Sequence, residues 1–197
     1  MSDYAARYML FFALSLMACG AARGDVPSDT SEQGRWGEWG PVESCPQGQY
    51  VWGFRVKGEP WVNNGDDTAL NAVQLICKSG VNGAAHYIKS LEGEWGRWGR
   101  DHVCGETPAT AFAIQVEPYQ GQDKETSSID DTAAGNIKMK CGSEILVGDP
   151  PAAWGNWTGF YSCPDGQKIT GFRTKVEPEQ GTDDDTAMNA MQVYCRN

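Results

Sequence analysis

The chain has 197 residues and a formal net charge of −10 at pH 7, from 16 Lys and Arg residues against 26 Asp and Glu residues. A chain this acidic is repelled by the phosphates of nucleic acids and by anionic membranes, so neither is expected as a partner. The 24 Gly and 10 Pro residues, and the lack of any long stretch with a 3.6-residue apolar period, predict little helix.

The first 24 residues have the layout of a secretory signal peptide. Arg7 precedes an apolar run over residues 8–18, and small residues follow over 19–22. The run is shorter than the roughly 18 residues that a membrane-spanning helix needs, so we expect a secreted protein with no transmembrane span. The alternative is a bacterial lipoprotein, because Leu16-Met17-Ala18-Cys19 resembles a lipobox that would anchor the chain through Cys19.

Residues 25–33 are predicted to be a flexible N-terminal segment, and residues 34–197 a single domain built from three copies of one motif. The copies span about residues 34–92, 93–151 and 152–197. Each copy opens with Trp-Gly-x-Trp, and the first tryptophans lie 59 residues apart both times, at Trp36, Trp95 and Trp154. A Glu-Pro pair, an Asp-Asp-Thr-Ala stretch and a closing cysteine follow in every copy.

The middle copy departs from the other two. It has a longer stretch between its Glu-Pro and Asp-Asp pairs, and it has Gly135 where the others have Asn71 and Asn189. The extra residues are polar, which is typical of a surface loop.

Six cysteines remain after the signal peptide, and in a secreted chain they predict three disulfides. Many pairings are possible, but each copy contains one opening and one closing cysteine. The pairing that treats the copies alike is Cys45–Cys77, Cys104–Cys141 and Cys163–Cys195. Each bond would contribute on the order of 3 to 4 kcal/mol in the chain-entropy model.

Aromatic and β-branched residues gather in residues 50–57 and 72–77, which predicts two strands in copy one. Their counterparts are residues 111–116 and 137–141 in copy two, and 168–176 and 191–195 in copy three. Each copy is therefore predicted to be a small antiparallel sheet with one apolar face. Three such faces can be buried against one another, so we expect an all-β fold closed as a three-sided prism.

These features resemble the vitelline membrane outer layer protein family over essentially the whole mature chain. The resemblance rests on the Trp-Gly-x-Trp openings, the Asp-Asp-Thr-Ala-x-Asn stretches and the Gly-Phe-x-x-Lys-x-Glu-Pro stretch at residues 171–178. It implies a β-prism of three Greek-key sheets with pseudo-threefold symmetry, an extracellular coat or secretion role, and transfer of N-acetylglucosamine oligosaccharides. Thr170 and Arg196 stand in the region where well-known members carry a fourth disulfide.

The paired aspartates are candidates for chemistry, because adjacent carboxylates can bind calcium, contact sugars or act as acid and base. We favour a structural interpretation, since an Asp before Thr-Ala can cap backbone N–H groups in a turn that every sheet needs. The glutamates before the prolines repeat in the same way and are expected to pair with Lys57 or Lys175. The candidate glycan contacts among these carboxylates are Glu59, Asp67, Asp131 and Asp185.

Tryptophan rings stack on sugars as well as fill cores, and the repetition of six of the eight tryptophans in the openings favours a structural role for those six. Trp61 lies outside the openings and is the first candidate for sugar stacking. Asn156-Trp157-Thr158 is an N-glycosylation sequon, usable in a eukaryotic host if the Asn is exposed. His86 and His102 are isolated and expected at the surface, and no metal or cofactor is predicted.

Two classes of function follow. The favoured one is a non-enzymatic component of an extracellular coat, mucous layer or secretion that binds N-acetylglucosamine-containing glycans or other coat proteins. The alternative, supported by the family resemblance alone, is an enzyme that transfers glycosyl groups among chitin-like oligosaccharides. A cleft lined by non-equivalent carboxylates and aromatic residues would argue for the enzyme.

Overall fold

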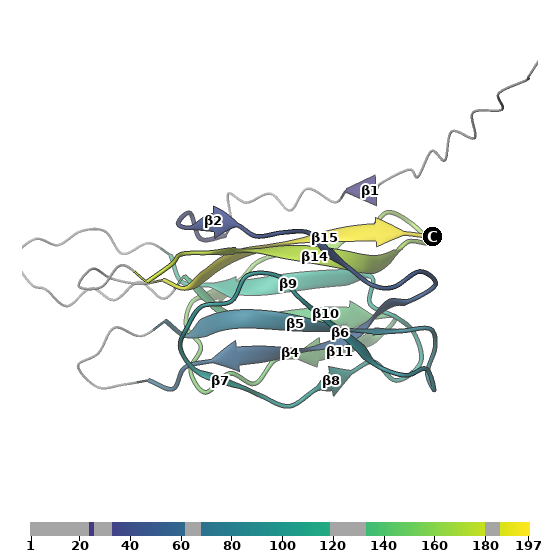
Figure 1. Ribbon diagram of the computed structural model, residues 1–197, viewed down its shortest axis with the longest axis horizontal. Coiled ribbons are helices and arrows are strands. Elements are labelled where there is room, and N and C mark those ends of the chain that lie inside the picture. Colours follow the sequence, from purple (N-terminus) through teal and green to yellow (C-terminus); the bar gives the residue numbers. More distant parts are fainter. Residues whose placement is uncertain (1–23, 26–32, 62–67, 119–132, 180–185) are drawn as a thin grey trace, which may run out of the picture.

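The computed structural model describes residues 24–25, 33–61, 68–118, 133–179 and 186–197, and over these ranges the chain forms fifteen strands. They make three antiparallel sheets of five strands each. The long strands run lengthwise along the molecule (Figure 1). Across the same ranges, no helix has the length and hydropathy to cross a bilayer.

We name each sheet after the copy that supplies its two long strands. Sheet one contains β4 (Tyr50–Gly58), β5 (Leu70–Lys78), β6 (His86–Lys89), β7 (Arg97–Trp98) and β8 (His102–Val103). Sheet two contains β9 (Ala111–Val116), β10 (Ala134–Cys141), β11 (Glu144–Val147), β12 (Asn156–Trp157) and β13 (Tyr161–Ser162). Sheet three contains β14 (Lys168–Val176), β15 (Met188–Arg196), β1 (Gly24–Asp25), β2 (Glu38–Trp39) and β3 (Glu43–Ser44).

The two short strands that begin each copy, which we call its opening, pair with the sheet of another copy. This differs from the prediction of one sheet per copy. β7 and β8, from copy two, pair with β4 of sheet one, and β12 and β13, from copy three, pair with β9 of sheet two. The opening of copy one closes the ring, because β2 and β3 pair with β14 of sheet three. Every sheet is therefore completed by a neighbouring copy.

The three disulfides join neighbouring sheets. Cys45 follows β3 of sheet three and is bonded to Cys77 in β5 of sheet one. The other bonds are Cys104–Cys141, from sheet one to sheet two, and Cys163–Cys195, from sheet two to sheet three. This is the pairing that the repeat predicts, and it ties the three sheets into a covalent ring.

The inner faces of the sheets pack into one apolar core. Three phenylalanines at equivalent positions, Phe54, Phe112 and Phe172, are fully buried, one from each sheet. Burying a side chain of this size stabilises the fold by about 1.5–3 kcal/mol. The apolar face that each copy cannot cover alone is thus covered by the other two.

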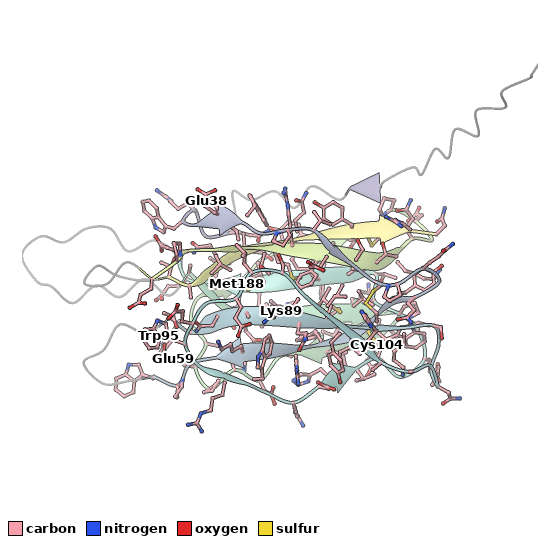
Figure 2. All side chains as sticks on the ribbon, viewed as in Figure 1. Glu38, Glu59, Lys89, Trp95, Cys104 and Met188 are labelled. Atoms are coloured by element: carbon pink, nitrogen blue, oxygen red, sulfur yellow. A yellow bond between two sulfur atoms is a disulfide. The ribbon has the colours of Figure 1, made fainter. Side chains whose placement is uncertain are left out.

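One end of the prism is marked by the Glu-Pro pairs that follow β4, β9 and β14. Figure 2 shows Glu59 and Trp95 at this end and Cys104 toward the other. The alanines of the Asp-Asp-Thr-Ala stretches lie here in the left-handed backbone region, all with φ of 46°. Their carbonyls accept hydrogen bonds from the backbone N–H groups of the glutamates, in the pairs Glu59–Ala69, Glu117–Ala133 and Glu177–Ala187.

Both described ends of the segment 25–33 contact sheet three. β1 pairs with β15, and the buried Gln33 accepts a hydrogen bond from the backbone N–H of Met191. These contacts were not expected of a flexible segment, and the domain boundaries themselves stay a prediction.

Candidate functional site

A chain of hydrogen bonds fixes the first tryptophan of the following copy at the Glu-Pro end. Thr68 Oγ1 donates to Glu59 Oε2 over 2.7 Å, and Asn71 Nδ2 donates to Thr68 Oγ1 over 2.6 Å. The fully buried Asn71 then accepts a hydrogen bond from the backbone N–H of Trp95 over 3.1 Å. Copy three repeats the chain with Glu177, Thr186, Asn189 and Trp36.

Copy two replaces this asparagine by Gly135, and the backbone of Trp154 takes the space. A Cβ added at Gly135 would lie 2.6 Å from the Trp154 carbonyl oxygen and 2.8 Å from its nitrogen. An asparagine therefore cannot fit there without moving the opening of copy three.

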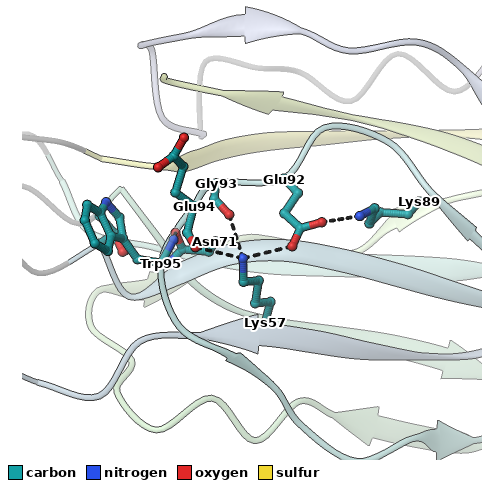
Figure 3. A network of polar contacts seen from close by, with 8 residues as sticks. Lys57, Asn71, Lys89, Glu92, Gly93, Glu94 and Trp95 are labelled. Atoms are coloured by element: carbon teal, nitrogen blue, oxygen red, sulfur yellow. Dashed lines mark hydrogen bonds and ion pairs between the residues drawn. The ribbon is translucent and has the colours of Figure 1, made fainter. Parts of the chain in front are cut away.

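A second set of contacts holds each opening from the side. Lys57 Nζ donates to Glu92 Oε1 over 2.8 Å and to the carbonyls of Gly93 and Glu94, directly before Trp95 (Figure 3). Lys175, at the equivalent position, donates to the Arg35 carbonyl directly before Trp36, whereas Gln115 of copy two donates to the Gly155 carbonyl directly after Trp154. The expected pair of Lys57 with Glu59 is wrong, because the lysine pairs with Glu92.

Glu92 is held charged by two lysines. Burial acts to raise the pKa of the Glu92 carboxyl, but the hydrogen bonds and positive charges of Lys57 and Lys89 outweigh burial and lower that pKa. The carboxylate therefore stays ionised while it fixes the segment that leads into the copy-two opening.

Groove one is a cavity of about 530 Å³ between the segment before β2 and the edge of sheet two. Arg35 and Trp36 form one wall, and Glu117, Asn156 and Trp157 form the other. Trp36 is 45% exposed and Trp157 is 36% exposed. The groove thus offers two aromatic surfaces from non-equivalent positions of the repeat, together with a guanidinium, a carboxylate and an amide.

Groove two, of about 270 Å³, is related to groove one by the pseudo-threefold symmetry. It keeps the same frame, with Trp95 in place of Trp36 and Glu177 in place of Glu117. Its other polar side chains are acidic: Glu38 stands for Asn156, Glu94 stands for Arg35, Glu92 stands for Gln33, and Glu179 also lines this groove. Two equivalent grooves in one chain therefore differ in charge.

Two prolines occupy the third related position. A Cβ added at Gly58 would lie 2.8 Å from Pro151 and 2.9 Å from Pro150, so these rings pack directly on the end of β4. Asp149, just before them, accepts a hydrogen bond from Arg100 Nε over 2.8 Å and lies 2.8 Å from His102 Nε2. Burial acts to raise the pKa of the Asp149 carboxyl, but His102 and Arg100 lower it overall.

His102 is more enclosed than the surface position expected for it. Its side chain is 9% exposed, and its ring stacks on Phe54 with centroids 5.4 Å apart. The imidazole therefore belongs to the packing of sheet one and to the anchor of Asp149.

The second tryptophan of every opening stacks on a cation. Arg173 lies over Trp39 and Arg55 lies over Trp98. Copy two has no arginine at this position, and Lys138 of the neighbouring strand lies over Trp157 instead, 4.5 Å from the ring centroid. Such contacts are worth about 0.5–1 kcal/mol at exposed sites, so these three rings have a structural use.

The candidates from the sequence are spread over this end of the prism. Trp61 is 62% exposed, but it is outside the lining of both grooves. Glu59 is engaged by Thr68, and Asp67, Asp131 and Asp185 lie outside the described residues. Asn156 is exposed and lines groove one.

Sequence reasoning missed Trp36, Trp157 and Glu117 as a group. Repetition marked all three as structural, and they come from three different copies. The available signal was a difference between copies, because positions 35 and 156 change charge among otherwise equivalent segments.

Comparison with known proteins agrees with the fold and the repeat. A family model described as Vitelline membrane outer layer protein I (VOMI) matches residues 27–197. Proteins named vitelline membrane outer layer protein 1 homolog, from Mus musculus and from Homo sapiens, are each 35% identical over 171 residues, covering 85% of this chain and 81% of theirs.

Solved structures with the same fold are distant in sequence. Single-chain recombinant jacalin aligns with a TM-score of 0.51 at 8% identity, over 84% of this chain and 90% of its own. Artocarpin in complex with mannotriose aligns with a TM-score of 0.50 at 10% identity, over 84% and 93%. The predicted all-β prism of three sheets is confirmed.

Proposed function

Because this chain belongs to the vitelline membrane outer layer protein I family, we propose that it is a secreted, non-enzymatic protein that binds glycans in groove one. In this role it would contribute to an extracellular coat, mucous layer or secretion by holding glycan-bearing components. N-acetylglucosamine oligosaccharides are the ligands to test first.

The observation that carries the proposal is the lining of groove one. The apolar face of a sugar ring packs on an indole, and its hydroxyls need hydrogen-bond partners around the edge. Trp36 and Trp157 supply aromatic surface, and Arg35, Glu117 and Asn156 supply polar groups. A volume of about 530 Å³ lies in the range of roughly 300–1,000 Å³ that is typical of small-molecule sites.

The fold gives independent support for the class of ligand. Artocarpin, which shares the fold, has been solved with mannotriose bound. A prism of this kind can therefore present a sugar site, although the location in this chain is argued from groove one alone.

The choice of binding over catalysis rests on the carboxylates. Glycosyl transfer and hydrolysis commonly use two carboxyl groups on opposite sides of the scissile bond. Among its described lining residues, groove one has a single carboxylate, Glu117. Groove two has several, so product analysis is needed to test the enzyme alternative.

The experiment compares two equivalent tryptophans. N-acetylglucosamine oligomers are titrated into the chain purified from an oxidising host that does not glycosylate, and the same mixtures are analysed by mass spectrometry after long incubation. Trp36→Ala is expected to weaken binding by about 0.5–1.5 kcal/mol, roughly twofold to thirteenfold, whereas Trp95→Ala in groove two leaves it unchanged. Equal losses in both variants, or oligomers of altered length, would contradict the proposal.

A further inference from the structure

We propose that Asn156 carries an N-linked glycan when the chain passes through a secretory pathway that attaches one, and that the stem of this glycan covers groove one. The attachment stands on the sequence and the exposure of Asn156. The covering of groove one rests in addition on the proposed function of that groove.

The acceptor is specific to one copy. Asn156-Trp157-Thr158 is the only Asn-x-Ser/Thr sequence in the chain, and the equivalent segments read Glu38-Trp39-Gly40 and Arg97-Trp98-Gly99. The second tryptophan is kept in all three copies, whereas the residues on both sides of it become Asn and Thr in copy three alone. The sequon is therefore not a by-product of the repeat.

The fold leaves the acceptor amide accessible. Asn156 belongs to the two-residue strand β12, both residues of which are exposed, and its backbone pairs with Val116 at the end of β9. The half-buried Thr158 has both of its hydroxyl bonds to backbone groups, because Oγ1 accepts a hydrogen bond from the N–H of Ile114 over 3.2 Å and donates one to the carbonyl of Gly159 over 3.0 Å. A glycan on Asn156 would thus displace no hydrogen bond of the sequon threonine.

The attachment is a group transfer with a donor from the host pathway, a lipid-linked oligosaccharide pyrophosphate. The amide Nδ2 of Asn156 bonds to the anomeric carbon of the first sugar, the bond from that carbon to the pyrophosphate oxygen breaks, and the amide gives up one proton. The product is neutral at this position, so the charge of groove one does not change.

The position of Asn156 gives the glycan its effect. Asn156 lines groove one together with Trp36 and Trp157, so the first sugars begin beside the two indoles. A ligand tied by a short link has an effective concentration in the millimolar range. Even a weakly held stem would therefore compete with free oligosaccharide for these rings.

The test separates attachment from covering. The full chain is secreted from a glycosylating eukaryotic host and weighed by intact mass spectrometry, beside Asn156→Gln, which removes the sequon, and Thr158→Ser, which keeps it. A glycan mass is expected on the wild type and on Thr158→Ser but not on Asn156→Gln. An unmodified wild-type chain overturns the proposal.

The covering of groove one by the glycan is measured on the wild-type chain, with no substitution. The same wild-type chain is made in an oxidising host that does not glycosylate, and both forms are compared for hydroxyl-radical labelling of Trp36 and for binding of N-acetylglucosamine oligomers. We expect less labelling of Trp36 and at least about tenfold weaker binding in the glycosylated form. Equal labelling in both forms contradicts the covering, whereas reduced labelling with no oligosaccharide binding in either form supports it and contradicts the proposed function instead.

Discussion

Two buried asparagines, Asn71 and Asn189, set the position of the tryptophans that border the grooves. Each joins a threonine in its own copy to the backbone N–H of the first tryptophan in the following copy. Gly34 and Gly93 pass beside them, and a Cβ at either glycine would lie within 2.6 Å of an asparagine Oδ1. A single side chain thus controls how closely one copy approaches the next.

Removal of such an asparagine should destabilise the fold. Asn71→Ala leaves the backbone N–H of Trp95 without its acceptor and removes the hydrogen bond that Thr68 Oγ1 accepts, while the bond from Thr68 to Glu59 remains, so the cost is about 1–3 kcal/mol at this buried site. Chemical denaturation under oxidising conditions measures the change in the free energy of unfolding. Asn82→Ala, at an exposed position, is the matched control and should stay within about 0.5 kcal/mol of the wild type.

Glu92 predicts how the stability of the fold depends on pH. Its folded-state pKa is lowered, so its contribution is present above the unfolded pKa and is lost as the pH falls through the folded pKa. Glu92→Gln should therefore lower the free energy of unfolding at neutral pH, and the difference from the wild type should shrink in acid. If the two free energies of unfolding differed by the same amount at every pH, the ionised carboxylate of Glu92 would not be what stabilises its contacts with Lys57 and Lys89.

The exchanged openings and the disulfides both join neighbouring copies into one fold. Each opening completes the sheet of the preceding copy, and each disulfide joins two different sheets. The loops closed by the three bonds are similar, with sequence separations of 32, 37 and 32 residues. The sheets are therefore held together by equivalent links around the prism.

Loss of any one disulfide should have nearly the same effect. Replacing both cysteines of one pair by serine is expected to lower the free energy of unfolding by about 3–4 kcal/mol, whichever pair is chosen. Denaturation of the three double variants, Cys45→Ser/Cys77→Ser and its two counterparts, measures this. A much larger loss for one pair would show that the sheets do not share the constraint equally.

The elements show what the sequence can and cannot predict. The long strands and the cysteine pairing follow from local pattern and from the spacing of the copies, and both appear in the fold. The exchange of openings does not follow, because β2 and β3 lie more than a hundred residues from β14 and pair with it only once the ring has closed. The partner of Lys57 was missed for the same reason, since Glu92 comes from the segment that enters the next opening.

In the whole molecule, the candidate sites lie where the threefold pattern is broken. The pseudo-threefold symmetry of the fold relates three positions: groove one with mixed polar groups, the smaller acidic groove two, and a site filled by Pro150 and Pro151. The sequence pointed to Trp61 because that residue is not repeated, yet the two grooves are lined by repeated tryptophans with unrepeated neighbours. Comparison of the copies at such neighbours is the way to find sites of this kind.

The claim that groove one binds free N-acetylglucosamine oligosaccharides is tested most directly by filling the groove with a large side chain. Gly159 lines groove one, and an added Cβ there meets nothing within 4 Å; the same is true of Gly80, which is outside both grooves. Gly159→Trp and Gly80→Trp should therefore both fold with the stability of the wild type. The measurement is the affinity for N-acetylglucosamine oligomers of each variant and of the wild type, all made in a host that does not glycosylate. We predict that Gly159→Trp binds at least about tenfold more weakly, a loss of about 1.4 kcal/mol, whereas Gly80→Trp binds as the wild type does; a folded Gly159→Trp variant with wild-type affinity would contradict the account.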